Sequence, residues 1–107
     1  MKVIGLISVQ DLKAFDAYKA GVGETITLYG GTVKFRGQKV KDYWNELSCP
    51  GFEGFVEIDF PSEAQATRWA KSPEYQSLLA IRSRAMRLTL FGVEDPSKPI
   101  SKSSNTR

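Results

Sequence analysis

The chain has 107 residues, an ordinary composition for a globular protein and a formal net charge of +3, which together predict one domain with one modest core. It has no histidine and a single cysteine, which excludes Ser–His–Asp triads, histidine zinc sites and intrachain disulfides. The last 13 residues hold three of the 15 basic residues and one of the 12 acidic ones, so the remainder is too balanced in charge for a general nucleic-acid or membrane surface.

The chain begins with a predicted strand and a predicted helix. Residues 3–9 are a β-branched apolar run, which is typical of a strand. Asp11 is placed to cap the helix that follows. The apolar side of that helix recurs at helical spacing through Leu12, Phe15, Tyr18, Val22 and Ile26. The pair Gly30-Gly31 ends it, because glycine adopts the left-handed cap conformation freely.

Alternation predicts two further strands, at residues 32–36 and 52–60. In the first strand, Val33 and Phe35 are expected on one face and Thr32, Lys34 and Arg36 on the other. In the second, one face is expected to carry Phe52, Val56, Ile58 and Phe60, and the other Glu53, Phe55, Glu57 and Asp59. The connection at 37–51, which contains Trp44, is long for a small domain. Connections of this length are often functional or partly structured.

A second helical region and a last strand complete the pattern. Ser62 and Gln65 have the spacing of a capping box. The helix breaks at Ser72-Pro73, where serine suits a cap and proline suits the first helical position, and it is expected to resume to about Arg84. Residues 86–93 alternate again and predict the final strand.

The resulting order, β-α-β-β-α-β, predicts an α+β ferredoxin-like fold with a four-stranded antiparallel sheet. We expect this single domain to span residues 1–94, with a flexible tail at 95–107 that is rich in Ser, Pro and Lys. Both helices would cover one sheet face. The other face would carry Phe55 and Phe91 and therefore needs a cover, for which a second copy of the sheet is the simplest candidate.

The second sheet face is the expected functional surface. It would gather Lys34, Arg36, Glu53, Phe55, Glu57, Asp59, Arg87, Thr89 and Phe91. In a cavity between two sheets, desolvation and neighbouring charges would shift carboxylate pKa values, so that Glu57 or Asp59 could act as a general base. Arg36 would hold an anionic group. The alternative is a solvated face on which Arg36 pairs with Glu57 or Asp59.

Four other residues are candidates, each with a structural alternative. Arg82 would reach the pocket or only tie the broken helix to a neighbour. Tyr18 is a candidate proton donor and Tyr75 a candidate ligand contact. The alternative is that both are core residues whose hydroxyls are hydrogen-bonded within the protein. Trp44 would close a pocket or pack across a dimer. No metal or cofactor motif is present among these residues.

A competing pattern points to RNA. Residues 51–58 partly match the signature strand of the RNA-recognition motif, which has the same element order. However, Phe52 and Phe55 are three residues apart and should point to opposite faces. Acidic residues on the same strand would repel phosphates. We therefore expect no nucleic-acid partner.

Several motifs occur together: Asp11, Phe15 and Tyr18; Tyr29-Gly30-Gly31; Arg36-Gly37; Asp59-Phe60-Pro61-Ser62 with Ala66 and Trp69; and Ser72-Pro73-Glu74-Tyr75-Gln76 with Arg82. With them the chain resembles the domain-of-unknown-function 1330 family of the dimeric α/β-barrel superfamily, over residues 2–94. Phe15, Asp59 and the 37–51 connection depart from the usual family pattern. The resemblance implies a homodimer whose sheets pack face to face. It implies no particular reaction, since the superfamily includes cofactor-free monooxygenases, isomerases and stress proteins.

We therefore expect an uncharacterised small dimeric protein that acts as a cofactor-free enzyme or binder on a small organic anion or polar aromatic, by acid–base chemistry. The alternative is a non-catalytic dimeric ligand-binding or stress-related module. Neither a cofactor nor a metal is expected. No apolar run is as long as a membrane span or matches a signal peptide, so no membrane partner and a cytoplasmic location are expected.

Overall fold

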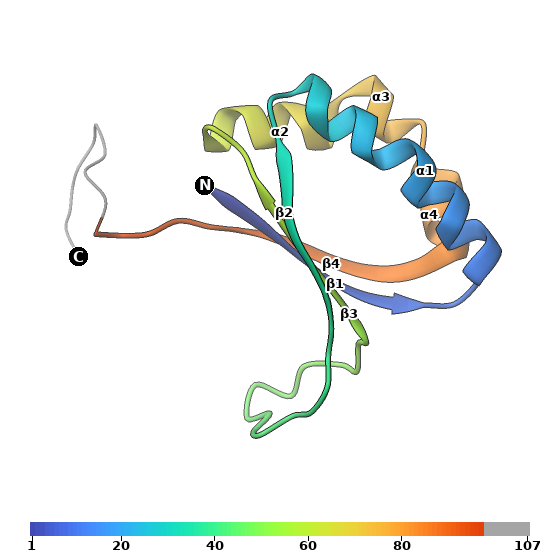
Figure 1. The fold of residues 1–107 in the computed structure, drawn as a ribbon, viewed down its shortest axis with the longest axis vertical. Coiled ribbons are helices and arrows are strands. Elements are labelled where there is room, and N and C mark those ends of the chain that lie inside the picture. Colours follow the sequence, from blue (N-terminus) through green and yellow to red (C-terminus); the bar gives the residue numbers. More distant parts are fainter. Residues whose placement is uncertain (98–107) are drawn as a thin grey trace.

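The computed structural model describes residues 1–97. Its strands are β1 (Lys2–Val9), β2 (Thr32–Gln38), β3 (Gly54–Asp59) and β4 (Met86–Val93), which form one antiparallel sheet in the order β2-β3-β1-β4. Its helices are α1 (Leu12–Leu28), α2 (Glu63–Lys71), α3 (Pro73–Gln76) and α4 (Leu79–Ala85). All of them lie on one face of the sheet (Figure 1). The predicted α+β ferredoxin-like fold is confirmed; most of the expected tail, from residue 98 onward, lies outside the described residues.

Local side-chain caps start the helices where the sequence predicts. The side chains of Asp11 and Ser72 accept hydrogen bonds from the backbone three residues on, at 3.1 and 3.0 Å. Ser62 accepts from the Gln65 N–H at 3.2 Å. The Gln65 side chain does not complete the predicted capping box, because its Nε2 donates to the carbonyl of Tyr29 at 3.2 Å. It thereby ties the start of α2 to the end of α1.

The helix after the break is divided once more than predicted. The break at 72–73 is confirmed, but two helices, α3 and α4, follow it in place of one. The N–H of Ser77 donates to the Pro73 carbonyl at 3.0 Å, and the N–H of Leu78 donates to the Tyr75 carbonyl at 2.9 Å. The second bond spans only three residues, so the last turn of α3 tightens and ends there.

The core lies between the helices and the sheet and is built around one aromatic cluster. Trp69 is 2% exposed, and its ring centroid lies 5.5 Å from that of Phe60 and 4.6 Å from that of Tyr75. Its indole N–H donates to Thr25 Oγ1 at 3.0 Å. Because the polar edge of the indole is satisfied internally, Trp69 can be fully buried without an energetic penalty for its N–H.

A β-bulge in β2 overturns part of the predicted face assignment. The register shifts between Val33 and Phe35, so that Phe35 pairs with Glu57 and Arg36 pairs with Val56. Directly paired residues point to the same face of a sheet. Phe35 therefore lies on the uncovered face and Arg36 on the helix-covered face. The prediction that Phe35 shares the face of Val33, with Arg36 opposite, is wrong because the bulge adds one residue to the alternation.

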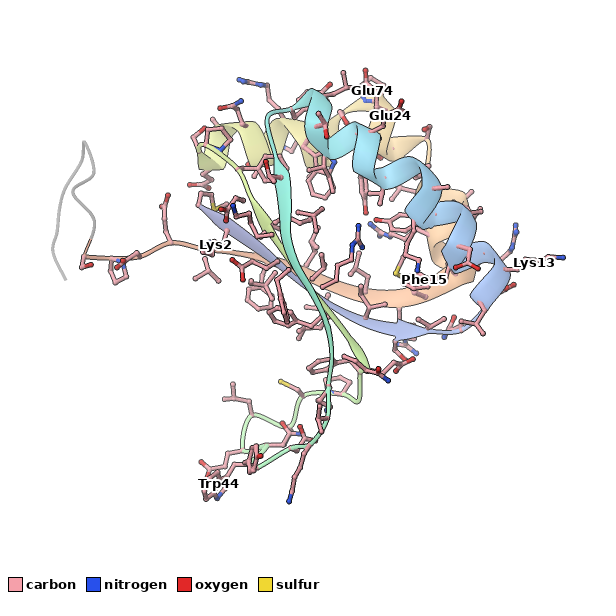
Figure 2. The ribbon with its side chains drawn as sticks, in the orientation of Figure 1. Lys2, Lys13, Phe15, Glu24, Trp44 and Glu74 are labelled. Atoms are coloured by element: carbon pink, nitrogen blue, oxygen red, sulfur yellow. The ribbon has the colours of Figure 1, made fainter. Side chains whose placement is uncertain are left out.

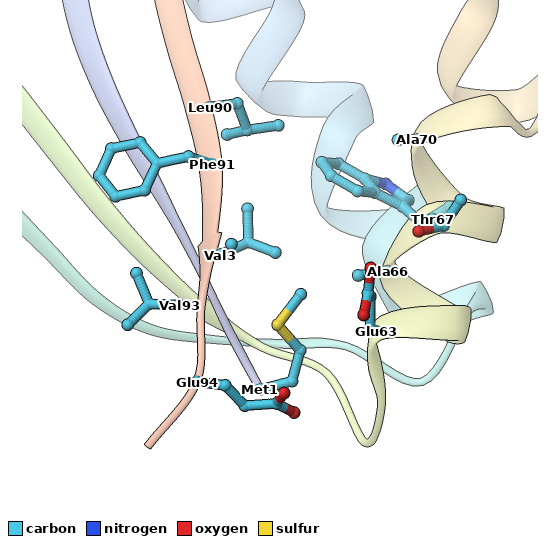
Figure 3. Close-up of a pocket in the computed structure, with 12 residues that line it drawn as sticks. Met1, Val3, Glu63, Ala66, Thr67, Ala70, Leu90, Phe91, Val93 and Glu94 are labelled. Atoms are coloured by element: carbon cyan, nitrogen blue, oxygen red, sulfur yellow. The ribbon is translucent and has the colours of Figure 1, made fainter. Parts of the chain in front are cut away.

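The uncovered face, which we call the apolar face, carries apolar side chains beside the charged residues Lys2, Glu57, Asp59 and Arg87. Its apolar members, placed by the strand pairings, are Ile4, Leu6, Phe35, Phe55, Phe91 and Val93. Phe35 is 56% exposed, and its ring lies edge-on to that of Phe55, with centroids 6.0 Å apart. Figure 3 shows Phe91 and Val93 on the opposite side of β4 from Leu90. Within residues 1–97 no element covers this face (Figure 1).

Residues 39–53 form an arm that projects from the sheet between β2 and β3 (Figure 1). The strand expected from residue 52 begins only at Gly54. The arm is organised by its own hydrogen bonds, because the Asn45 side chain donates to the Cys49 carbonyl at 3.1 Å and accepts from the Cys49 N–H at 3.0 Å. Trp44 lies at the far end of this β2–β3 arm (Figure 2) and is 81% exposed.

Candidate functional site

A cavity of about 50 Å³ lies between α1 and the helix-covered face of the sheet, and we call it the helix–sheet cavity. Most of its wall is apolar, and Phe15 contributes from the inner side of α1 (Figure 2). Tyr18, Lys19 and Arg36 are the lining residues with polar or charged ends, apart from Trp69, whose N–H is already bonded within the core. The volume admits a few water molecules or one small ligand group, since a water needs about 10–15 Å³.

Arg36 gives this cavity a free positive charge. The residue is exposed and lines the cavity, so it lies at the opening. Within the described part of the chain its guanidinium makes no hydrogen bond or ion pair. The alternative that it pairs with Glu57 or Asp59 is therefore wrong. The second cation, Lys19, is only loosely engaged, with its Nζ 3.8 Å from Asp16 Oδ1.

Three of the predicted residues form one hydrogen-bonded chain. The Tyr18 and Tyr75 hydroxyl oxygens are 2.9 Å apart, and Arg82 donates from its guanidinium to the Tyr75 hydroxyl at 2.8 Å. The Arg82 guanidinium also lies over the Tyr75 ring, 5.8 Å from its centroid. Burial, and then the neighbouring Tyr75, raises the pKa of Tyr18 far above its usual range. Tyr18 lines the cavity, whereas Tyr75 and Arg82 are not among its lining residues.

The expected partnership between Arg36 and the strand carboxylates is not formed. Glu57 and Asp59 lie on the uncovered face, where Lys2 Nζ is 2.8 Å from Glu57 Oε2 and 2.7 Å from Asp59 Oδ1. Hydrogen bonding to both carboxylates raises the pKa of Lys2 to about 12, and the hydrogen bond from Lys2 lowers the pKa of Asp59. A role of either carboxylate as a general base stays a prediction, and it would operate on the face away from Arg36.

Sequence reasoning overlooked Lys2 and Lys19. Lys2 alternates with Ile4 and Leu6 along β1, and this period of two could have placed it on the uncovered face beside the carboxylates. Lys19 is one residue after Tyr18 and one turn after Phe15, so it borders the inner side of α1. Neither lysine stood out, because single charges on amphipathic elements are common.

Trp44 lies away from the helix–sheet cavity, on the β2–β3 arm (Figure 2). Cys49 belongs to the same arm and does not line this cavity either. The prediction that Trp44 closes a pocket is therefore not met for this cavity within one chain. Cys49 is exposed and borders a hollow of about 620 Å³ between the arm and β4. Within residues 1–97 no group of three or more His, Cys, Asp or Glu side chains is placed to hold a metal ion.

A second hollow, of about 400 Å³, lies between α2 and the end of β4 (Figure 3). Its floor is apolar, and Figure 3 shows Met1 spanning the space between the strand and the helix. The charged residues that line it are both acidic, Glu63 and Glu94. It thus has no counterpart to Arg36, and no residue of the predicted site reaches it.

Comparison with known protein families shows the family to which the chain belongs. The model of a domain of unknown function, DUF1330, matches residues 3–96. The chain belongs to this family. No functionally curated protein matches the DUF1330 chain by sequence. Within the described residues, this DUF1330 domain has no helix long and apolar enough to cross a membrane.

Solved structures show the same fold at low sequence identity. A protein of unknown function from Rhodopseudomonas palustris, RPA0582, has a TM-score of 0.66 and 19% identity, with 89% of this chain and 82% of that chain covered. At3g17210 from Arabidopsis thaliana has a TM-score of 0.69 and 15% identity, covering 92% and 98%. A protein of Nitrosomonas europaea, considered an antibiotic biosynthesis monooxygenase, has a TM-score of 0.55 and 15% identity, covering 87% and 98%. At these identities the likeness establishes the fold alone.

Proposed function

We propose that this DUF1330 protein binds a small organic anion in the helix–sheet cavity, with Arg36 holding the oxyanion. The observation that carries the proposal is a guanidinium without a partner in residues 1–97, at the opening of an apolar cavity. A planar guanidinium can donate two parallel hydrogen bonds to a carboxylate. Lys19 adds a second positive charge, and the apolar wall accommodates the carbon part of the ligand.

The lining of the cavity favours binding over acid–base catalysis. None of the side chains that line it is a carboxylate. The two expected bases, Glu57 and Asp59, are engaged with Lys2 on the other face. The cavity can therefore donate hydrogen bonds to an oxygen that carries negative charge, but its lining has no carboxylate to act as a general base. This supports the non-catalytic ligand-binding alternative.

The proposal includes a homodimer in which a second copy covers the apolar face and the β2–β3 arm. A standard interface needs about 800 Å² per partner, and aromatic side chains contribute much of it. Phe35 and Phe91 on this face are 56% and 44% exposed and Trp44 on the arm is 81% exposed, so a partner can still bury apolar area on each.

Light scattering at micromolar concentration tests the dimer. We expect a dimer for the wild type and a monomer for Phe35→Asp, which places a charge in the apolar face. Leu12→Asp is the matched control, because Leu12 is an exposed apolar residue on α1, away from that face. A monomeric wild type would sink the proposal.

A cytoplasmic location belongs to the same proposal. Cys49, the only cysteine, is exposed with a free thiol, and free thiols persist in reducing compartments. Fractionation of cells that express the full chain, with detection of the soluble cytoplasmic pool, tests this point.

Ligand titration tests the binding site. We expect acetate or isobutyrate to raise the unfolding temperature of the wild type, since a ligand at ten times its Kd stabilises by about 1.4 kcal/mol. Arg36→Ala should lose this effect, whereas Arg84→Ala, an exposed arginine on α4, should keep it. Phenol tests the polar aromatic class. Equal stabilisation of both variants by the carboxylates would reject the proposed site.

A further inference from the structure

We infer that the chain Arg82–Tyr75–Tyr18 orients the Tyr18 hydroxyl as a hydrogen-bond donor toward the helix–sheet cavity, so that the cavity selects small ligands whose oxygen atoms accept hydrogen bonds, such as carboxylates and ketones, and rejects amines. This inference rests on the proposed binding function and specifies its ligand class. It is drawn from the direction of each hydrogen bond in the chain.

The first step is the bond from Arg82. A guanidinium has donors and no acceptor, and it stays protonated in proteins. The 2.8 Å contact between Arg82 and the Tyr75 oxygen is therefore a bond that Tyr75 accepts. One side of the Tyr75 hydroxyl is thereby fixed as an acceptor.

The second step concerns the single proton of Tyr75. Tyr75 is 2% exposed, and within residues 1–97 the only other hydrogen-bond partner of its hydroxyl is the Tyr18 oxygen at 2.9 Å. If Tyr18 donated in this contact, the Tyr75 proton would be buried without an acceptor. A buried donor without a partner is strongly disfavoured. Tyr75 must therefore donate to Tyr18, and the charged donor behind it strengthens that bond.

The third step follows for Tyr18. Its oxygen accepts from Tyr75, so its own proton needs another partner. Tyr18 is also buried, at 8% exposed, but unlike Tyr75 it lines the helix–sheet cavity, where a water molecule or a ligand oxygen can accept that proton. Because burial keeps the pKa of Tyr18 far above its usual range, the hydroxyl holds this proton at neutral and mildly alkaline pH. Tyr18 can donate to a ligand oxygen without losing any existing hydrogen bond.

The polar lining of the cavity then consists of donors. Tyr18, Lys19 and Arg36 all offer hydrogen to a ligand, and the Trp69 N–H is already used by Thr25. Among the lining side chains the Tyr18 oxygen already accepts from Tyr75, and the remaining acceptor is the Met86 sulfur, which is a weak one. An amine that entered would find two cations and no acceptor of normal strength. A ligand oxygen that accepts hydrogen bonds finds three donors among the same side chains.

Three ligands of similar size separate the effects: isobutyrate as a charged acceptor, butanone as a neutral acceptor and isobutylamine as a charged donor. Chemical-shift titration of the full chain measures the Kd of each. We expect isobutyrate and butanone to bind and isobutylamine not to bind. Tyr18→Phe should weaken butanone about tenfold, which corresponds to about 1.4 kcal/mol.

Variants of Arg82 test the direction of the chain without touching the cavity. Arg82→Lys can only donate and should preserve butanone affinity. Arg82→Gln can accept from Tyr75, which allows the chain to reverse, and should weaken butanone several-fold. Because Arg82 is only partly buried, this pair remains informative if Tyr18→Phe fails to fold. Equal butanone affinity in the lysine and glutamine variants would overturn the inference.

The outcomes separate the two proposals. If Arg36→Ala abolishes isobutyrate binding while Tyr18→Phe binds both acceptors like the wild type, the anion site stands and the Tyr18 inference is rejected. If butanone binding depends on Tyr18 while isobutyrate binding is independent of Arg36, the inference stands and the role of Arg36 is rejected. Binding of isobutylamine as tight as that of isobutyrate rejects the donor-only cavity.

Discussion

Replacing Tyr75 by Phe tests the buried hydrogen-bond chain in the absence of any ligand. The ring and its contact with Trp69 are kept, so only the hydroxyl is lost. Arg82 loses an acceptor and Tyr18 loses a donor. At about 1 kcal/mol net for each hydrogen bond, the free energy of unfolding should fall by about 2 kcal/mol. For a domain of this size that corresponds to a decrease in Tm of roughly 10 °C.

The chain contains a matched control. The hydroxyl of Tyr29 donates to Glu74 Oε1 at 2.8 Å at the surface, so Tyr29→Phe should cost well under about 1 kcal/mol, because water replaces the lost partner. Urea unfolding followed by far-UV circular dichroism, at one protein concentration, measures both variants. The double variant Tyr18→Phe with Tyr75→Phe should cost less than the sum of the single variants, since the two residues share one bond. If Tyr75→Phe costs no more than Tyr29→Phe, the buried chain contributes nothing and the reasoning is refuted.

Three further predictions concern titration, the arm and the glycines. Because burial raises the pKa of Tyr18, the unfolded chain releases this proton near about pH 10 and the folded chain does not, so the free energy of unfolding should fall as pH rises above that value. In Tyr18→Phe the fall should be shallower by up to about 1.4 kcal/mol per pH unit. Equal slopes for the two proteins in pH-dependent unfolding would contradict this. Trp69→Phe leaves Trp44 as the only tryptophan, and acrylamide quenching of its fluorescence should increase as the dimer is diluted; quenching that is independent of concentration would remove the arm from the interface. Gly30 has φ of +84°, and a Cβ there would lie 2.9 Å from the side-chain nitrogen of Gln65, so Gly30→Ala should destabilise the fold by about 1–2 kcal/mol. Gly23 has open space around it, so Gly23→Ala should stabilise the fold by up to about 1 kcal/mol. Urea unfolding of both variants measures which is the more stable.

The parts of the fold that depend on neighbours in sequence could be predicted residue by residue. Asp11, Ser62 and Ser72 cap their helices as expected, because a cap bonds the backbone only three residues on. The second division of the last helix, at Ser77, could not be predicted, since it follows from hydrogen bonds of ordinary residues. The Gln65 amide likewise leaves its local partner for Tyr29, which is distant in the sequence.

The candidate site shows the same contrast. The sequence singled out Tyr18, Tyr75, Arg36 and Arg82 as candidates, and their roles stay predictions. It could not show that Arg82 reaches Tyr75 and that Tyr75 reaches Tyr18, because those contacts join α1, α3 and α4 across the core. The direction of the hydrogen bonds, and with it the donor character of the cavity, exists only once the three side chains are together.

By itself the sequence determined the order of the elements, their caps and the presence of two differently covered sheet faces, because all of these follow from periodicity and from bonds within a few residues. Which side chains lie on each face of β2 was decided by the tertiary structure. Strand alternation assumes one residue per step, and the bulge between Val33 and Phe35 breaks that assumption only when β2 pairs with β3. Because of that single extra residue, the Arg36 side chain lies on the face of the helix–sheet cavity, and Lys2 pairs with Glu57 and Asp59 on the other face.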